Sequence, residues 1–294
     1  MENNPGYYPG CSLTGSSREY GKSTEKLYEA LGITLQEIED WVCCGATPGH
    51  SSSHLLPDAL ALKNLSQAKK QGIEKLITPC MACYSRFKFA QYNVSRDPGI
   101  REKLEEILGE KYDDENEIDI VHPLDNLNEL VILNKIKKNI KKIPEDLKAV
   151  CYYGCVFTRP PEVMGVSDYE NPCQMERLLD AAGIETVEWN YKTKCCGAAL
   201  SISNTEIALD LCKEILSDAK SRGADMIVVA CPLCHVNLDL RQGQIEKRHN
   251  LKFKIPVLYI TQVIGLVLGL SVEDLGIDKH FVDASKLLKE KRLM

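Results

Sequence analysis

The chain has 294 residues, enough for one large domain or two of ordinary size, and 44% of them are hydrophobic while 6% are aromatic, which is usual for an α/β protein. A net charge of −6 gives no basic surface for nucleic acid or for an anionic membrane. The first residues carry no basic stretch followed by an apolar one, so we expect a cytoplasmic protein. The longest apolar run, 255–270, is shorter than the roughly 20 residues of a spanning helix, which predicts buried core and no membrane insertion.

Strands and helices alternate in the first half of the chain. The pattern predicts a short strand over 7–10, a helix over 23–31 that Ser23 or Thr24 caps, a helix over 58–70, and an apolar strand over 76–78 that leads to Cys80. A glycine follows each helix, which is a common way for a helix to end.

The second half repeats this order. It predicts a strand over 149–153, helices over 174–182 and 205–220, and a buried strand over 226–230 that leads to Cys231. Such alternation is typical of a parallel sheet in each half. We therefore expect an α/β fold with two similar domains, 1–145 and 146–294, with the lysine-rich segment 134–148 as linker and a helical tail beyond Gln262.

Ten of the thirteen cysteines form one five-cysteine pattern that occurs twice. The first copy is Cys11, Cys43, Cys44, Cys80 and Cys83, and the second is Cys155, Cys195, Cys196, Cys231 and Cys234. Both doublets read Cys-Cys-Gly-Ala, and Cys80 follows Cys44 by 36 residues where Cys231 follows Cys196 by 35. Because open parallel sheets bind ligands beyond the carboxyl ends of their strands, both Cys-x-x-Cys pairs should lie at such an edge, together with Cys11 and Cys155.

This arrangement of cysteines indicates a metal cofactor, because Cys-x-x-Cys pairs in a reducing compartment are more often metal ligands or catalytic groups than disulfides. Four thiolates suffice for zinc. Five thiolates that include an adjacent pair favour an iron–sulfur cluster, whose neighbouring irons adjacent cysteines can reach. Five ligands also exceed the four corners of a cubane cluster. Either one cysteine in each half is spare, or the cluster is not a simple cubane.

Other residues near the pattern have more than one interpretation. Cys151, Cys173 and Cys212 have no counterpart in the first half and are left out of the ligand set, although Cys151 shares a strand face with Cys155. The candidate donors to cluster sulfur are His50, His54 and His235, whereas His122 is expected to be structural. Arg159 and Lys194 lie near ligand cysteines in sequence, and either meet an anionic substrate or act as surface or thiolate-balancing charges.

Short sequences around and between the cysteines add to the pattern, which extends over nearly the whole chain. They are TRPPEV at 158–163, ENP at 170–172, CPLCHVNLD at 231–239 and IPVLY at 255–259. Together with the doubled cysteines they resemble the CCG-domain family, and within it the B subunits of heterodisulfide reductase from methanogenic archaea. By that resemblance each half binds a non-cubane 4Fe-4S cluster through its five cysteines, one of them bridging. The two clusters would lie at the sheet edges between the halves.

The resemblance also implies an activity in methanogenesis. The family's B subunits reduce the mixed disulfide of coenzyme M and coenzyme B to two thiols, and we expect the disulfide to be split between the two clusters. The sequence has neither a Gly-rich phosphate loop nor a ferredoxin run. Electrons should therefore come from partners, which the resemblance identifies as an iron–sulfur C subunit and a flavin-containing A subunit. The alternatives are an electron-transfer subunit of another oxidoreductase and a zinc-stabilised structural protein.

Overall fold

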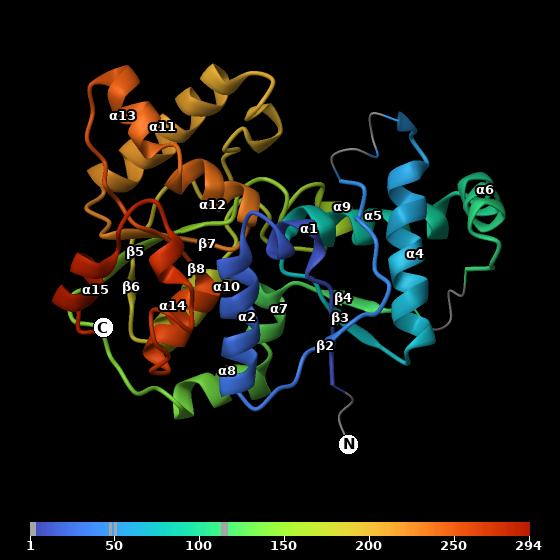
Figure 1. Cartoon of the computed structure of the whole chain (residues 1–294), viewed down its shortest axis with the longest axis horizontal. Helices are drawn as coiled ribbons and strands as arrows, with labels where there is room; N and C mark the ends of the chain where they lie inside the picture. The colour runs from blue at the N-terminus through green and yellow to red at the C-terminus, as the bar shows by residue number, and fades with distance from the viewer. Residues whose placement is uncertain (1–3, 47–48, 50–51, 113–116) are drawn as a thin grey trace.

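The computed structural model in Figure 1 describes residues 4–46, 49, 52–112 and 117–294. Within these residues the strands form two four-stranded sheets with the orders β2-β1-β3-β4 and β6-β5-β7-β8. The strands of the first sheet are β1 (Gly6–Tyr7), β2 (Gln36–Glu37), β3 (Lys75–Ile77) and β4 (Asp119–Val121). Those of the second are β5 (Lys148–Tyr152), β6 (Glu185–Thr186), β7 (Met226–Val229) and β8 (Val257–Tyr259).

Every strand pair in both sheets is parallel. Tyr7 lies opposite Ile77, and in the second sheet Cys151 lies opposite Val228. The two sheets therefore have one topology in two copies, as expected for parallel strands connected by crossovers. The predicted α/β fold with two similar halves is confirmed.

Helices flank both sheets. In the first half they are α1 (Gly10–Thr14), α2 (Arg18–Ala30), α4 (Leu56–Lys70), α5 (Met81–Arg96), α6 (Pro98–Leu108), α7 (Pro123–Leu127) and α8 (Leu130–Lys138). In the second they are α9 (Pro161–Met164), α10 (Gln174–Ala181), α11 (Thr205–Ser221), α12 (Pro232–Asp239), α13 (Gln242–His249), α14 (Ile260–Val267) and α15 (Ser285–Glu290), with 3-10 turns η1 (Ala198–Leu200) and η2 (Ile277–Lys279).

The start of α2 corrects one prediction. The helix begins at Arg18, so Ser23 and Thr24 lie inside it and cap nothing. The Ser23 hydroxyl pairs with the Thr261 hydroxyl at 2.7 Å, and the Thr24 hydroxyl donates to the Tyr20 carbonyl at 2.8 Å. Both hydroxyl groups are buried, so residues that favour caps in an isolated sequence here bond within the core instead.

The apolar run 255–270 contains β8 and α14, whose residues are all buried. Segment 134–148 includes the end of α8 and the first residue of β5, and the chain between them has no helix or strand. Beyond Gln262 the tail is helical only in part, in the rest of α14, η2 and α15. Among the described helices, none combines the length and the apolar character needed to cross a membrane.

The two halves meet where α2 packs beside α14 (Figure 1). Tyr20 of α2 stacks on Tyr259 at the end of β8, with ring centroids 4.1 Å apart and planes 3° apart. Stacked rings of this kind contribute beyond the area that they bury. This contact joins the carboxyl-end region of the second sheet to a helix of the first half.

Candidate metal centre

Both Cys-x-x-Cys pairs lie where strand β3 or β7 gives way to a helix. Cys80 and Cys231 are the N-cap residues of α5 and α12, and the strands before them end at Ile77 and Val229. The expected position at the carboxyl ends of the strands is confirmed. The positive end of a helix dipole favours thiolate over thiol at such a place.

The fold brings the five predicted cysteines of each copy together. In the first half the sulfurs of Cys44 and Cys83 are 3.2 Å apart, and side-chain hydrogen bonds join Cys80 to Cys83 and Cys11 to Cys43. The second half repeats each contact: the sulfurs of Cys196 and Cys234 are 3.6 Å apart, and side-chain hydrogen bonds join Cys231 to Cys234 and Cys155 to Cys195. Ten residues that are far apart in sequence thus form two groups of five thiols.

Hydrogen bonds stabilise thiolates in both groups. The Cys83 thiol and the first backbone N–H groups of α5 lower the pKa of Cys80 to about 7 despite its burial. The Cys155 thiol and the backbone N–H of Gly197 lower the pKa of Cys195 to about 6. Each group therefore contains a sulfur suited to binding a cation.

Two glycines let the backbone approach these sulfurs. A Cβ atom on Gly10 would lie 3.1 Å from the sulfur of Cys83, and one on Gly154 would lie 2.9 Å from the sulfur of Cys234. Both glycines have positive φ angles, +62° and +70°. Larger residues are therefore disfavoured by both backbone conformation and space.

A tyrosine hydroxyl braces each cysteine doublet. Tyr8 donates to the carbonyl of Val42 at 2.7 Å, and Tyr152 donates to the carbonyl of Lys194 at 2.6 Å. These carbonyls belong to the residues immediately before the two doublets. The structural counterpart of Tyr8 is therefore Tyr152, which also has the same place in the Tyr-x-Gly-Cys sequences at 8–11 and 152–155.

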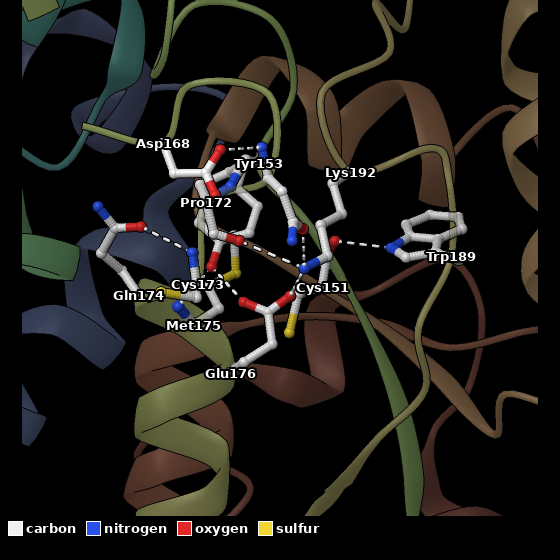
Figure 2. A network of polar contacts seen from close by, with 11 residues as sticks. Cys151, Tyr153, Asp168, Pro172, Cys173, Gln174, Met175, Glu176, Trp189 and Lys192 are labelled. Carbon is white, nitrogen blue, oxygen red and sulfur yellow. Dashed lines mark hydrogen bonds and ion pairs between the residues drawn. The ribbon is translucent and has the colours of Figure 1, made fainter. Parts of the chain in front are cut away.

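Tyr153 belongs to a polar network that Figure 2 shows. Its hydroxyl donates to the Glu176 carboxylate, which forms an ion pair with Lys192 at 2.8 Å. The Lys192 carbonyl accepts the backbone N–H groups of Tyr153 and Gly154 at 2.9 and 3.1 Å. The network thus connects the segment that carries Cys155 to the segment that leads to Cys195.

Cys151 lies in this network and not among the five thiols. Its side chain is buried, and burial followed by the charge of Glu176 raises its thiol pKa well above the usual value. The indole N–H of Trp189 donates to its carbonyl at 2.9 Å. The strand face that Cys151 was predicted to share with Cys155 does not bring it to the other cysteines.

The other two unassigned cysteines also have separate environments. Cys212 is buried in α11, and its thiol donates to the Cys196 carbonyl at 3.3 Å. Cys173 is exposed at the N-cap position of α10, where its side chain makes no capping hydrogen bond. Cys212 is thus part of the core, whereas Cys173 is neither buried nor an effective cap.

The polar candidates have partners other than cysteine. His235 contacts the Val257 carbonyl at 3.0 Å through its Nε2 and stacks on Tyr259. His54 is exposed in a loop, and His50 lies outside the described residues. Arg159 pairs with Glu170 at 3.1 Å, and Lys194 pairs with Glu214 at 3.4 Å.

His122 connects the two thiol groups, a role that the sequence did not reveal. It follows β4, and its Nε2 contacts the Pro79 carbonyl at 2.8 Å while its Nδ1 accepts the Leu124 N–H at 3.1 Å. Burial lowers its pKa to about 3, against the opposing influence of the Pro79 and Ala230 carbonyls. Pro79 and Ala230 immediately precede Cys80 and Cys231, so the imidazole is bonded to the strand end of the first half and close to that of the second.

Tyr20 lies near a cysteine of each group. Its hydroxyl donates to the Ala230 carbonyl at 3.2 Å. Burial first, and then the charges of Cys231 and Cys80, raise its phenol pKa well above the usual value. Tyr20 is therefore close enough to one cysteine of each half for both charges to act on its hydroxyl.

The donor chemistry of each group fits an iron–sulfur cluster. Five sulfurs, a glycine without a Cβ and a backbone N–H directed at a thiol form a sulfur-rich cradle in each half, as such clusters require. In the part of the chain that the structure describes, no three His, Cys, Asp or Glu side chains have the spacing of a single-ion site.

Comparison with known proteins agrees with this duplication. The family model of the cysteine-rich domain CCG matches residues 6–88 and again 149–239. The chain is 30% identical, over 91% of each chain, to a protein of Archaeoglobus profundus whose name likens it to the B subunit of heterodisulfide reductase. It is 27% identical to the B subunit of the ferredoxin/F(420)H(2)-dependent CoB-CoM heterodisulfide reductase of Methanosarcina acetivorans, over 96% of this chain and 94% of that one.

Two further similarities bear on function and fold. The 8-methylmenaquinol:fumarate reductase membrane anchor subunit of Wolinella succinogenes is 29% identical over 98% of this chain and 100% of its own length. The crystal structure of a hypothetical protein from Helicobacter pylori superposes with a TM-score of 0.74 at 14% identity, over 96% of this chain and 52% of that one. That structural match supports the fold alone.

Proposed function

Because this chain belongs to the CCG cysteine-rich domain family, we propose that it is the catalytic subunit of a heterodisulfide reductase and converts the mixed disulfide of coenzyme M and coenzyme B into two thiols, as a step of methanogenesis. The observation that carries the proposal is the presence of two five-thiol groups, one in each half, with a cysteine of each close to Tyr20. A disulfide needs two electrons, so two equivalent redox sites close to one residue suit its cleavage.

In this proposal each group of five cysteines holds one 4Fe-4S cluster of the non-cubane type. When bound, the two clusters would supply one electron each and a Lewis-acidic iron for each departing sulfur. The residues of the chain provide the positions. Tyr8 and Tyr152 brace the doublets, His122 bonds the carbonyl before Cys80, and Tyr20 bonds the carbonyl before Cys231.

We propose partner subunits as the electron source. The Methanosarcina relatives are named as subunits of heterodisulfide reductases, and an iron–sulfur C subunit with a flavin-containing A subunit would complete the electron path. We also propose that the protein works in the cytoplasm. Its relative in Wolinella is named a membrane anchor subunit, so co-purification with membranes is the outcome that would contradict this location.

Loss of either thiol group tests the two-cluster mechanism. With a small chemical reductant as donor, Cys83→Ala and Cys234→Ala should each abolish heterodisulfide reduction almost completely, because one remaining site delivers only one electron. Iron and sulfide analysis should show first that each variant keeps its other cluster. Cys212→Ala is the control and should retain both clusters and activity. Substantial activity in Cys83→Ala or Cys234→Ala would reject cleavage between two clusters.

The similarity to the fumarate reductase subunit favours a second candidate, an electron-transfer subunit of another oxidoreductase in which the clusters only conduct electrons. The two candidates differ in the activity of the isolated chain. A catalytic subunit reduces the heterodisulfide with an artificial donor, whereas a conduit takes up electrons without reducing it.

A further inference from the structure

The two thiol groups differ in charge at one equivalent position. Arg86 follows Cys83 by three residues on α5, and Asn237 follows Cys234 by three residues on α12. Residues three apart are neighbours on a helix surface. Because Cys83 and Cys234 contact the doublet cysteines Cys44 and Cys196, the two positions lie next to corresponding thiol pairs.

In the first half this position places a cation close to a thiol. The Arg86 guanidinium lies over the Phe89 ring, 4.6 Å from its centroid, and its charge acts on Cys44. Asp58 of α4 also attracts Arg86, and its buried carboxylate accepts the side-chain N–H of Asn93 at 2.7 Å. The guanidinium is thus close enough to both groups for its charge to act on the Asp58 carboxylate and on the Cys44 thiol.

In the second half a neutral amide occupies the same place. Asn237 donates to the Cys196 carbonyl at 3.0 Å and accepts from the Ser201 hydroxyl at 2.7 Å. Arg241, one turn further along, donates to the Asn237 side-chain oxygen at 3.2 Å and to the Ser201 carbonyl at 2.8 Å. Arg241 is therefore linked to the doublet through the side chain of Asn237.

The carboxylate of the first half also has no equivalent. A Cβ on Gly45 would meet the Cα of Pro57 at 3.0 Å, and one on Gly197 would meet the Cα of Ala208 at 3.0 Å. Pro57 and Ala208 thus correspond, and the residues after them are Asp58 and Leu209. The second site has an apolar side chain where the first has the partner of Arg86.

Resting on the proposed function, we propose that Arg86 makes the first-half site the easier of the two to reduce, so that an incoming electron occupies it before the second-half site. Each reduction adds one negative charge to a cluster and changes no covalent bond. A full positive charge beside the ligand stabilises the reduced form and raises its potential more than an amide dipole does. The two halves are alike in fold and unequal in electron affinity.

An anaerobic redox titration of the iron-loaded chain, followed by electron paramagnetic resonance, tests this inference without measuring turnover. Wild type should show two reduction waves, and the one at higher potential should be missing from Cys83→Ala. Arg86→Gln should move that wave to lower potential and leave the other in place. Arg86→Lys keeps the charge and should restore most of the difference. Arg96→Gln is the matched control, because Arg96 lies on the same helix over the Tyr92 ring and should shift neither wave.

The outcomes separate this inference from the proposed function. Two waves that Arg86→Gln leaves unmoved, or a single wave in wild type, would overturn the role of Arg86 and leave the catalytic proposal intact. If Cys234→Ala removed the high-potential wave, the second-half site would be the one with the higher potential. That result would overturn the role of Arg86 as well. A chain that binds zinc and no iron would overturn the proposed function and this inference together.

Discussion

Gly154 lies close to a thiol, because a Cβ atom added to it would be 2.9 Å from the sulfur of Cys234. Gly154→Ala should therefore displace that sulfur and reduce the iron and sulfide content of the second half. Gly223→Ala is the matched control, since Gly223 has a similar φ angle of +72° and nothing within 4 Å of its Cβ. Each change should lower stability by about 1 kcal/mol through the positive φ. Equal iron contents in the two variants would contradict the view that the second site needs a residue without a Cβ at position 154.

His122 predicts how stability depends on pH. Its pKa is about 3 in the folded protein and 6.5 as a free group, so the unfolded chain binds the extra proton between these values. The stability that the neutral imidazole provides is complete above pH 6.5 and is lost as the pH falls towards 3. At pH 5 the loss is about 2 kcal/mol.

Urea unfolding at pH 7 and pH 5 measures this effect. His122→Gln should be less stable than wild type at pH 7 and should lose less of its stability on acidification. His54→Gln changes an exposed histidine and should keep the wild-type acid response. The same acid sensitivity in His122→Gln and wild type would mean that other groups determine it.

At the scale of elements, the loops that carry the cysteines are held by contacts from neighbouring helices. Glu176 at the start of α10 and Lys192 before the second doublet have side chains that are 19% and 12% exposed. Lys192→Met leaves the Glu176 carboxylate without its cation in this mostly buried place. We expect a loss of at least about 3 kcal/mol in the free energy of unfolding.

Lys194→Met provides the comparison, because Lys194 and Glu214 form an ion pair with side chains that are 45% and 47% exposed. Exposed pairs contribute at most about 1 kcal/mol. Chemical denaturation of both variants measures the loss in the free energy of unfolding for the mostly buried pair and for the exposed pair. Similar losses would show that the network in Figure 2 adds no more than a surface pair.

At the scale of the whole molecule, stability should depend on the cofactor. Each group draws ligands from segments that are far apart in the chain, so binding free energy becomes folding free energy. The anaerobic protein should contain about eight irons with comparable sulfide. Removal of the iron should lower the thermal midpoint markedly, as circular dichroism can measure. An unchanged melting curve would mean that the cysteines are peripheral to stability.

The division into domains at 145 and 146 stays a prediction. The two sheets have the same topology, and β5 begins at Lys148. The pair formed by Tyr20 and Tyr259, together with His122, nevertheless joins the halves through buried contacts. Separate expression of 1–145 and 146–294 would test whether either half folds alone.

The sequence by itself determined the two-fold repetition, the parallel α/β class and the ten candidate ligands. Residue type and spacing are local properties. A strand followed by Cys-x-x-Cys at the start of a helix can therefore be predicted without knowledge of any contact between distant segments. Only the tertiary structure decided which cysteines stay apart and which residues unite the sites. Cys151 forms a hydrogen bond with Glu176, and His122 lies close to backbone carbonyls from both halves. Both arrangements arise because segments that are remote in sequence pack together around these side chains. The unequal surroundings of the two sites, with Arg86 in one and Asn237 in the other, likewise emerge only when the halves are compared in space.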